Sequence, residues 1–297
     1  MTDEHDLLKA ICSDPDDDTI RLIYADWLDD NGRLTRADFI RAQIEYAQAQ
    51  PGDPLYRYSL WRNKAHEHTT SVTLRASLPD FPGIEFGNFS RGFADDIHVE
   101  DARALRASAP RVFGTFPVRS LRVRSLREPA ILADTPQLAF VRRLNLIYTR
   151  LTIDALRIIL ASPYLNNLTF LELDSNALPN DMIGALVEAA PNLPALRHLQ
   201  LGGNRVTDNG AVRLAQSLPF SQLHTLDLSN NLLGSPGAIA LARSPHLAAL
   251  NRLVLAGCGP VSPETIQALK ERFGAKVQLP ARMTELERRR PRRRGRG

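Results

Sequence analysis

The sequence predicts an α/β solenoid, in which short parallel strands alternate with helices, preceded by a small all-helical module. The main observation is internal repetition, because five segments follow the pattern LxxLxLxxNxL or a close variant. These segments start at Val141, Leu168, Leu196, Leu223 and Leu250, so their spacings are 27, 28, 27 and 27 residues. A second observation is the helical spacing of apolar residues between these segments, and a third is a non-repeating N-terminus with helix-starting residues.

The first half of each repeat predicts a short strand. In pairs such as Leu171 and Leu173, two leucines alternate with a polar residue, which places both leucines on one side of a strand. A strand this short cannot bury that side alone, so we expect each strand to lie beside the next in a parallel sheet. The residue three positions after the second leucine ends the strand, where a side-chain amide can satisfy turn groups. The predicted structural residues at this position are Asn176, Asn204, Asn231 and, in the last repeat, Cys258.

The second half of each repeat predicts a helix. In the first four repeats, apolar residues recur 15 and 18 positions after the repeat start, as in the pair Ala211 and Leu214, and this spacing marks one face of a helix. Thr207-Asp208 and Ser235-Pro236 supply helix-capping chemistry. A weaker copy of the strand pattern begins at Val118.

These repeats resemble leucine-rich repeats of the ribonuclease-inhibitor-like class, over residues 118–279. The resemblance implies a solenoid with parallel strands on its concave face and helices on its convex face. It also implies a protein that binds a partner rather than an enzyme.

Residues 1–48 do not repeat, and they predict three short helices. Asp14–Asp18 opens the second helix, for which Leu22, Ile23, Trp27 and Leu28 form the expected apolar face. Thr35, with Asp38 three residues later, is expected to cap the third helix. We interpret the aspartates as helix caps, because they lack the spacing, central glycine and final glutamate of a calcium loop.

A string within this segment resembles a bacterial repeat-companion domain that precedes leucine-rich repeats. It runs Asp14-Pro15-x-Asp17, Arg21-Leu22-x-Tyr24-Ala25-Asp26-Trp27-Leu28, Gly32, and Arg36-Ala37-x-Phe39-Ile40-Arg41-x-Gln43. The resemblance implies this order of domains and no chemistry. It leaves two roles open for the module, a cap on the first repeat or a second binding face.

The expected domains are therefore a helical module (1–48), a helical connector and entry segment (49–117), the repeats (118–279) and a disordered tail (280–297). Within the entry segment, Arg91-Gly92-Phe93 followed by Ile97-His98-Val99 is expected to begin the sheet.

The net charge of +4 conceals a strong asymmetry along the chain. Residues 1–48 carry 12 acidic and 5 basic side chains, which gives −7, whereas residues 282–297 carry eight Arg and two Glu, which gives +6. The two cysteines cannot form a disulfide framework, and no stretch has the length and hydropathy of a signal peptide or a membrane span. We therefore expect a monomeric cytoplasmic protein.

The sequence contains no Walker loop and no GxGxxG, HExxH or GxSxG motif, and its seven histidines are scattered. His66 and His68, two residues apart, do not share a face of a helix. We accordingly expect no catalytic residue, no metal and no cofactor.

The outward-facing strand residues form the predicted partner-binding surface. They are Arg122, Arg124, Arg143, Asn145, Phe170, Glu172, Asp174, His198, Gln200, Thr225, Asp227 and Arg252. Two interpretations remain open: an ordinary solvated sheet face, or a groove that is basic at its entry and acidic in its middle, and so selects a protein segment of matching polarity.

The arginine-rich end suggests an alternative function. Its candidate contacts with nucleic acid are Arg288, Arg289, Arg290, Arg292, Arg293 and Arg294. Arginines neutralise phosphates, but no aromatic residue stands among them to stack on bases. The leading hypothesis is a non-enzymatic protein–protein interaction scaffold, and the alternative is a nucleic-acid-associated protein that uses this tail and the basic entry strands.

Overall fold

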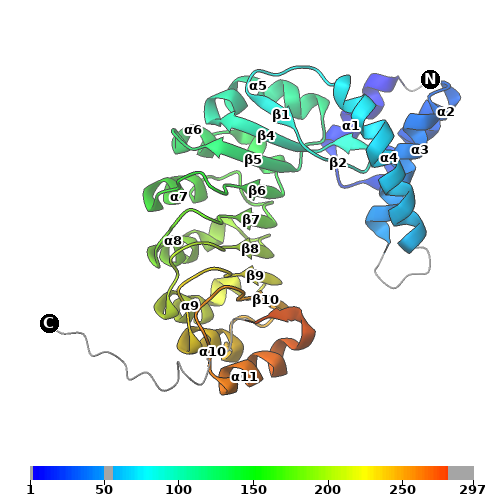
Figure 1. Ribbon diagram of the computed structural model, residues 1–297. Helices are drawn as coiled ribbons and strands as arrows, with labels where there is room; N and C mark the ends of the chain where they lie inside the picture. Colours follow the sequence, from blue (N-terminus) through cyan, green and yellow to red (C-terminus); the bar gives the residue numbers. More distant parts are fainter. Residues whose placement is uncertain (1–2, 50–55, 280–297) are drawn as a thin grey trace. The chain divides into compact units, whose positions relative to one another are not determined.

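The computed structural model describes residues 3–49 and 56–279, and its contacts divide the chain into two compact units (Figure 1). Unit 1 is Met1–Asn145 and unit 2 is Leu146–Gly297. The boundary falls inside the repeat that starts at Val141. The arginines predicted to contact nucleic acid, at positions 288–294, lie outside the described residues.

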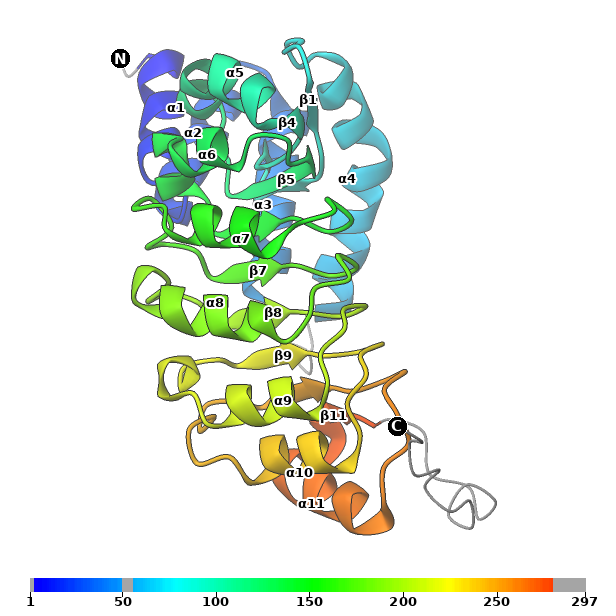
Figure 2. The ribbon, with the colours of Figure 1, turned by 90° about the vertical axis from the view of Figure 1, so that its left-hand side faces the viewer.

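Unit 2 alternates short strands with helices. Its strands are β7 (Phe170–Glu172), β8 (His198–Gln200), β9 (Thr225–Asp227), β10 (Arg252–Val254) and β11 (Val277–Gln278). Its helices are α7 (Ile153–Leu160), α8 (Asp181–Ala189), α9 (Asp208–Ala215), α10 (Ser235–Arg243) and α11 (Pro263–Phe273), with 3₁₀ turns at Ala190–Asn192, Leu218–Phe220 and Gly274–Lys276. Helices α7 to α10 all lie on one side of the strands, as Figures 1 and 2 show from two directions. The predicted α/β solenoid is confirmed.

The leucines of successive strands are aligned in unit 2. Leu171 pairs with Leu199, Leu199 with Leu226, and Leu226 with Leu253, all between parallel strands. Their side chains are fully buried. The last strand, β11, pairs Val277 with Leu253 and covers the final repeat. The predicted register is therefore confirmed.

The helical half of each repeat covers the other side of these leucines. The expected apolar pair Ala211 and Leu214 is fully buried on α9. The helix starts differ from the expectation, because Thr207 makes no side-chain cap and Gly234, not Ser235, is the N-cap of α10. Asp208 instead accepts hydrogen bonds from the backbone N–H groups of Gly234 and Gly237, at 2.7 and 2.8 Å. A side chain of one repeat thus satisfies the exposed amides of the next, which residue patterns within a single repeat do not reveal.

Unit 1 combines a helical module with the first strands. Its helices are α1 (Glu4–Ser13), α2 (Asp18–Asp30), α3 (Leu34–Gln48), α4 (Tyr56–Ala76), α5 (Ala102–Thr115) and α6 (Pro129–Ala133), with a 3₁₀ turn at Pro136–Phe140. Its strands are β1 (Ile84–Phe86), β2 (Phe89–Ser90), β3 (Phe93–Ala94), β4 (Asp96–Asp101), β5 (Ser120–Ser125) and β6 (Arg143–Asn145). Strand β1 pairs antiparallel with β4, and β4, β5 and β6 pair in parallel.

The entry segment differs from its prediction. Ile97-His98-Val99 lies in β4, as expected of a sheet strand. Arg91-Gly92-Phe93 does not join that strand, because Phe89–Ala94 forms a separate two-stranded hairpin with Arg91 and Gly92 at its turn.

Helix α2 buries a different face from the one predicted. Its buried residues are Arg21, Tyr24, Ala25 and Leu28. Leu22 and Ile23 are 37% and 51% exposed, so their assignment to the apolar face was wrong. The spacing of the buried positions is helical, but it begins at an arginine, and apolarity alone could not identify that residue as interior.

The aspartates at positions 14–18 serve as a cap and as ion-pair partners. Asp17 accepts a hydrogen bond from the Thr19 backbone N–H at 2.7 Å, which caps α2. Asp16 forms ion pairs with Arg119 and Arg142, at 2.8 and 3.1 Å. The acidic module and the basic entry strands therefore compensate each other's charge within unit 1.

The start of α3 also differs from the expectation. The helix begins at Leu34, and its N-cap Arg33 makes no side-chain cap. Asp38 instead contacts α4, through an ion pair with Arg62 and a 2.9 Å contact with Nε2 of His66. The predicted capping pair is thus replaced by contacts that join two helices.

Candidate partner-binding surface

Eight of the twelve predicted contact residues lie in unit 2, on the side of the strands opposite the helices. We call this set the strand face: Phe170, Glu172, Asp174, His198, Gln200, Thr225, Asp227 and Arg252. The strand register arranges it in rows, with Phe170, His198, Thr225 and Arg252 in one and Glu172, Gln200 and Asp227 in the next. Parallel pairing without a register shift therefore aligns residues that are 27 or 28 positions apart in the sequence.

The first row of the strand face carries stacked rings. Phe170 and His198 lie with their ring centroids 5.1 Å apart and their planes 19° apart. Nδ1 of His198 is 3.1 Å from the Thr225 hydroxyl oxygen, which fixes the orientation of the imidazole. His224, which the sequence did not single out, meets His198 edge-on at 6.2 Å. This edge of the face therefore offers flat apolar area with polar ring atoms.

The middle of the strand face is acidic. Burial, together with the neighbouring carboxylates of Asp227 and Glu172, raises the pKa of Asp174 to about 6. Its Oδ1 accepts a hydrogen bond from the Gly202 backbone N–H at 2.6 Å, while its Oδ2 is buried and has no hydrogen-bond partner among the residues that the structure describes. A carboxyl group held in this way is stabilised by any donor or cation that approaches it.

Gly202 makes room for that carboxylate. A Cβ at this position would lie 2.7 Å from Oδ1 of Asp174 and 2.8 Å from the hydroxyl oxygen of Ser229. The absence of a side chain therefore lets the backbone N–H reach the aspartate. The sequence pattern marked Gly202 only as an outward position and gave no reason for a glycine there.

The other four predicted residues lie in unit 1, where Arg122 and Arg124 belong to β5 and Arg143 and Asn145 to β6. Arg124 donates two hydrogen bonds to the carboxylate of Glu85 on β1, at 2.8 and 2.5 Å. Its charge is accordingly compensated by a strand that the sequence did not predict.

Other arginines of the entry segment are compensated as well. Arg103 pairs with Glu128, Arg106 approaches Asp134 at 3.8 Å, and Arg119 pairs with Asp16. The basic character that the sequence indicates for this segment is therefore reduced by partners within unit 1.

The asparagines at the strand ends hold consecutive repeats together. Nδ2 of Asn204 donates to the backbone carbonyls of Leu201 and Leu173, both at 3.0 Å, and its Oδ1 accepts from the backbone N–H of Leu178 at 3.0 Å. Asn176 and Asn231 make equivalent contacts one repeat earlier and one repeat later. Each buried amide thus joins the turn of its own repeat to the repeat before it.

Cys258 occupies the same place in the last repeat. Its Sγ donates to the Leu228 carbonyl at 3.0 Å, as the asparagine amides do. Burial raises the pKa of the thiol above its usual value, which keeps it protonated and able to donate. Cys258 is therefore a structural group rather than a nucleophile.

Comparison with known proteins finds a family model that matches two segments of unit 2. Residues 192–215 and 222–242 match the family model described as Leucine Rich repeat. These two segments of unit 2 are therefore similar to leucine-rich repeats. Among solved structures, the chain is similar to an internalin from Listeria monocytogenes, with 18% identity, coverage of 67% of this chain and 60% of that chain, and a TM-score of 0.35. A search of curated proteins finds no match.

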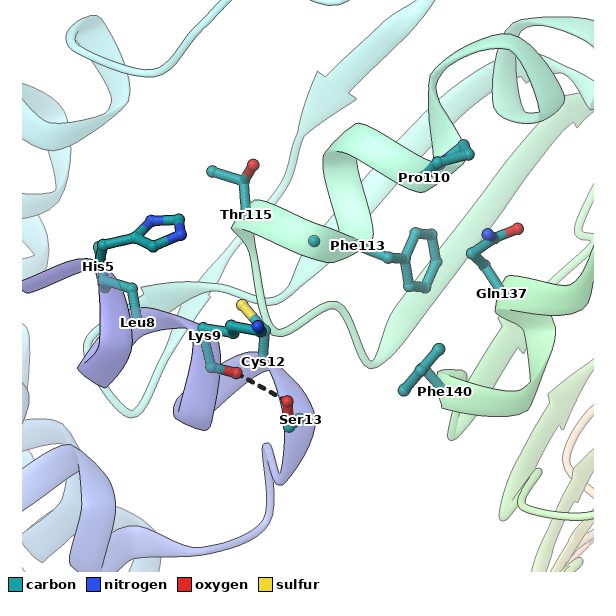
Figure 3. Close-up of a pocket in the computed structure, with 11 residues that line it drawn as sticks. His5, Leu8, Lys9, Cys12, Ser13, Pro110, Phe113, Thr115, Gln137 and Phe140 are labelled. Carbon is teal, nitrogen blue, oxygen red and sulfur yellow. Dashed lines mark hydrogen bonds between the residues drawn. The ribbon is translucent and has the colours of Figure 1, made fainter.

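Unit 1 also holds a pocket of about 520 Å³, between α1 and the segment formed by α5 and the following 3₁₀ turn (Figure 3). Its walls are largely apolar, with Leu8, Phe113 and Phe140, and its basic side chains are His5 and Lys9. Cys12 also lines it, but burial raises the pKa of this thiol to about 11, so it stays protonated at neutral pH. A nucleophilic role for this cysteine is therefore disfavoured.

Two negative findings apply to the described part of the chain. Within residues 3–49 and 56–279, no three His, Cys, Asp or Glu side chains are grouped closely enough to hold a metal ion. Over the same ranges, every helix is too short or too polar to traverse a bilayer.

Proposed function

We propose that this leucine-rich-repeat protein is a non-enzymatic scaffold that binds a protein segment on the strand face of unit 2. Stacked repeats present a long row of outward side chains on a rigid sheet, and leucine-rich-repeat proteins typically use such surfaces for protein–protein contacts. The rigid backbone favours binding because few groups must be ordered when a partner docks.

The observation that carries the proposal is the environment of Asp174. One carboxylate oxygen is satisfied by Gly202, the other is buried without a hydrogen-bond partner in the described chain, and Asp227 and Glu172 add negative charge nearby. A lysine or arginine from a partner that docks beside Asp174 and Asp227 would relieve the repulsion among the carboxylates.

The neighbouring ring row defines the rest of the expected partner segment. The stack of Phe170 on His198 supplies aromatic area beside the acidic centre. Aromatic area next to a charged group is typical of residues that dominate binding energy at interfaces. The expected partner therefore presents a basic side chain next to an apolar one.

Affinity capture with charge-reversed variants tests this function. We expect Asp227→Lys to reduce recovery of bound proteins at least tenfold, because it places a cation where the partner's cation should bind. Glu188→Lys makes a similar charge change at an exposed position of α8, on the helical side, and serves as the control. Bound proteins are identified and their recoveries compared between the two variants and the wild-type chain.

If all three chains recover the same amount of bound protein, the interface does not lie on the strand face. A separate variant in unit 1, with Arg122, Arg124 and Arg143 all changed to Glu, tests the basic positions of the predicted surface. A loss of recovery in this variant would assign part of the binding to unit 1, whereas the proposed interface in unit 2 predicts recovery equal to that of wild type.

The arginine-rich end supports a second candidate function, association with nucleic acid. Seven arginines stand among the last ten residues of the chain. Such a run binds phosphates without reading base sequence, and its binding weakens steeply with salt. This candidate concerns residues 288–297 alone and is compatible with partner binding by the repeats.

A further inference from the structure

The hairpin Phe89–Ala94 in unit 1 is held by the helical module through unusually specific contacts. Phe89 pairs with Ala94 and Ser90 with Phe93, and the two turn residues both have positive φ, 49° at Arg91 and 84° at Gly92. A two-residue turn of this kind holds its own backbone, and the residue that follows it, in a fixed geometry.

The module binds the backbone of this hairpin with two buried polar side chains. Oε1 of Gln43 accepts from the Gly92 backbone N–H at 2.6 Å, and Nε2 of Gln43 donates to the Phe89 carbonyl at 3.3 Å. Arg21, which is 2% exposed, donates to the Arg91 carbonyl at 3.4 Å and to the Pro15 carbonyl at 2.8 Å. A single glutamine of α3 thus joins the first strand of the hairpin to its turn.

Phe93 fills the centre of the helical module. It belongs to the same apolar cluster as Ile11, Leu28 and Ile40 from α1, α2 and α3. The guanidinium groups of Arg21 and Arg36 lie 4.9 and 5.1 Å from the centroid of its ring. These distances are typical of cation–π contacts, which are stronger when the arginine is desolvated.

The two turn residues, Arg91 and Gly92, also make specific contacts with the helical module. Nε of Arg91 pairs with Oδ1 of Asp18 at 2.8 Å. A Cβ at Gly92 would lie 2.3 Å from Cγ1 and 2.8 Å from Cα of Ile40, so only glycine fits against α3. Each residue of the triplet Arg91-Gly92-Phe93 is therefore matched by a different feature of the module.

The helical module needs the hairpin to complete its packing and its hydrogen bonds. Removal of the hairpin would leave Gln43 buried without the partners that the structure gives it, and a cavity the size of a phenyl ring between three helices. Residues of the string that resembles a repeat-companion domain, including Arg21, Ile40 and Gln43, are the ones that contact the hairpin.

We propose that helices α1 to α3 form a recognition groove for an Arg-Gly-Phe hairpin, occupied in this protein by its own residues 89–94. The groove accepts the same turn from a separate polypeptide when the chain's own hairpin is excluded. This inference concerns unit 1 alone and does not depend on the strand face.

The test uses the full-length chain with its own hairpin made unable to dock, by Gly92→Val together with Phe93→Ala. The probe is a fluorescein-labelled peptide with the sequence of residues 87–96, and binding is measured by fluorescence anisotropy. We expect the peptide to bind this vacated chain at least tenfold more tightly than the wild-type chain, in which the groove is occupied. A peptide with alanine in place of the central glycine should bind at least tenfold more weakly.

A second substitution in the vacated chain locates the binding. Gln43→Leu removes both hydrogen bonds to the hairpin backbone and should weaken peptide binding at least tenfold. Gln216→Leu makes the same change at an exposed position of unit 2 and should alter it less than threefold.

If the helices of the vacated chain are unstable, thermal melting of that chain still tests the proposal. A ligand that binds only the folded module raises the melting temperature, so the peptide should restore helical circular dichroism even where the empty groove has unfolded. A peptide that neither binds the vacated chain nor raises its melting temperature would overturn the proposal. Equal effects of the glycine and alanine peptides would overturn it as well.

Discussion

Leu199 and Leu226 pair directly across parallel strands β8 and β9, and both side chains are fully buried. Because each covers the other from water, the stability of one repeat depends on the next. We expect Leu226→Ala to lower the free energy of unfolding by about 2–5 kcal/mol, as for other large-to-small changes in a core. A denaturant titration measures this loss.

Leu232→Ala is the matched control, since Leu232 lies in the same repeat and is 65% exposed. Its effect should stay within about 0.5 kcal/mol. Similar losses for the two variants would contradict the burial pattern that the repeat register produces.

The asparagine at the strand end gives a second prediction. Asn204→Ala leaves the carbonyls of Leu201 and Leu173 and the N–H of Leu178 without the partner they have now, so we expect a loss of roughly 2–4 kcal/mol. Asn204→Cys should cost less, because a thiol can still donate to a carbonyl as Cys258 does. Asn209→Ala, at an exposed position of α9, is the control. The argument would be refuted if the cysteine variant had a lower free energy of unfolding than the alanine variant.

Asp174 predicts a pH dependence of stability. Burial and two neighbouring carboxylates raise its pKa to about 6 in the folded chain, against about 3.9 when unfolded. The unfolded chain therefore loses this proton first as pH rises, and the contribution of Asp174 to stability falls between about pH 4 and pH 6 and stays low above it. Asp174→Asn should be more stable than wild type at pH 7.5 by roughly 1 kcal/mol, after allowance for solvent screening.

This gain should shrink as pH falls toward 4, where the aspartate is protonated in the folded chain and about half protonated in the unfolded chain. Urea titrations of the two chains at pH 7.5 and pH 4 provide the comparison. A difference that stays constant with pH, or grows toward pH 4, would show that ionisation of Asp174 is not its cause.

Removal of residues 288–297 tests the arginine-rich end. We expect the truncated chain to bind duplex DNA more weakly at low salt. The slope of log K against log salt should fall by about 0.9 for each phosphate that the removed arginines neutralised. A slope unchanged by truncation would assign any binding of nucleic acid to other basic residues.

The unit 1 residues show where a sequence pattern is insufficient. Leu22 and Ile23 were assigned to the interior because they are apolar, yet the interior position belongs to Arg21. Its guanidinium is buried because carbonyls of Pro15 and Arg91 accept its hydrogen bonds and the Phe93 ring lies beside it. Those partners are up to 72 positions away, and no local pattern on α2 indicates them.

The strand face was predicted in its positions but not in its electrostatics. The alternation of leucines predicts Asp174 and Asp227 on the outward side, and the strand register aligns Asp227 with Gln200 of the preceding repeat. The raised pKa of Asp174 depends on its burial and on neighbouring carboxylates, and the compensation of Arg124 depends on Glu85 of another strand. Neither the raised pKa of Asp174 nor the pairing of Arg124 with Glu85 can be predicted from the spacing of residues in the sequence.

The sequence by itself determined the repeat fold, its register and the roles of the strand-end asparagines. It could do so because residues that are one repeat of 27 or 28 positions apart in the sequence lie next to each other in the fold. Only the tertiary structure decided which helix face the N-terminal module buries, where the Arg91-Gly92-Phe93 turn docks and which charges are compensated. Those features arise from contacts between non-equivalent segments, whose separation in the sequence follows no period.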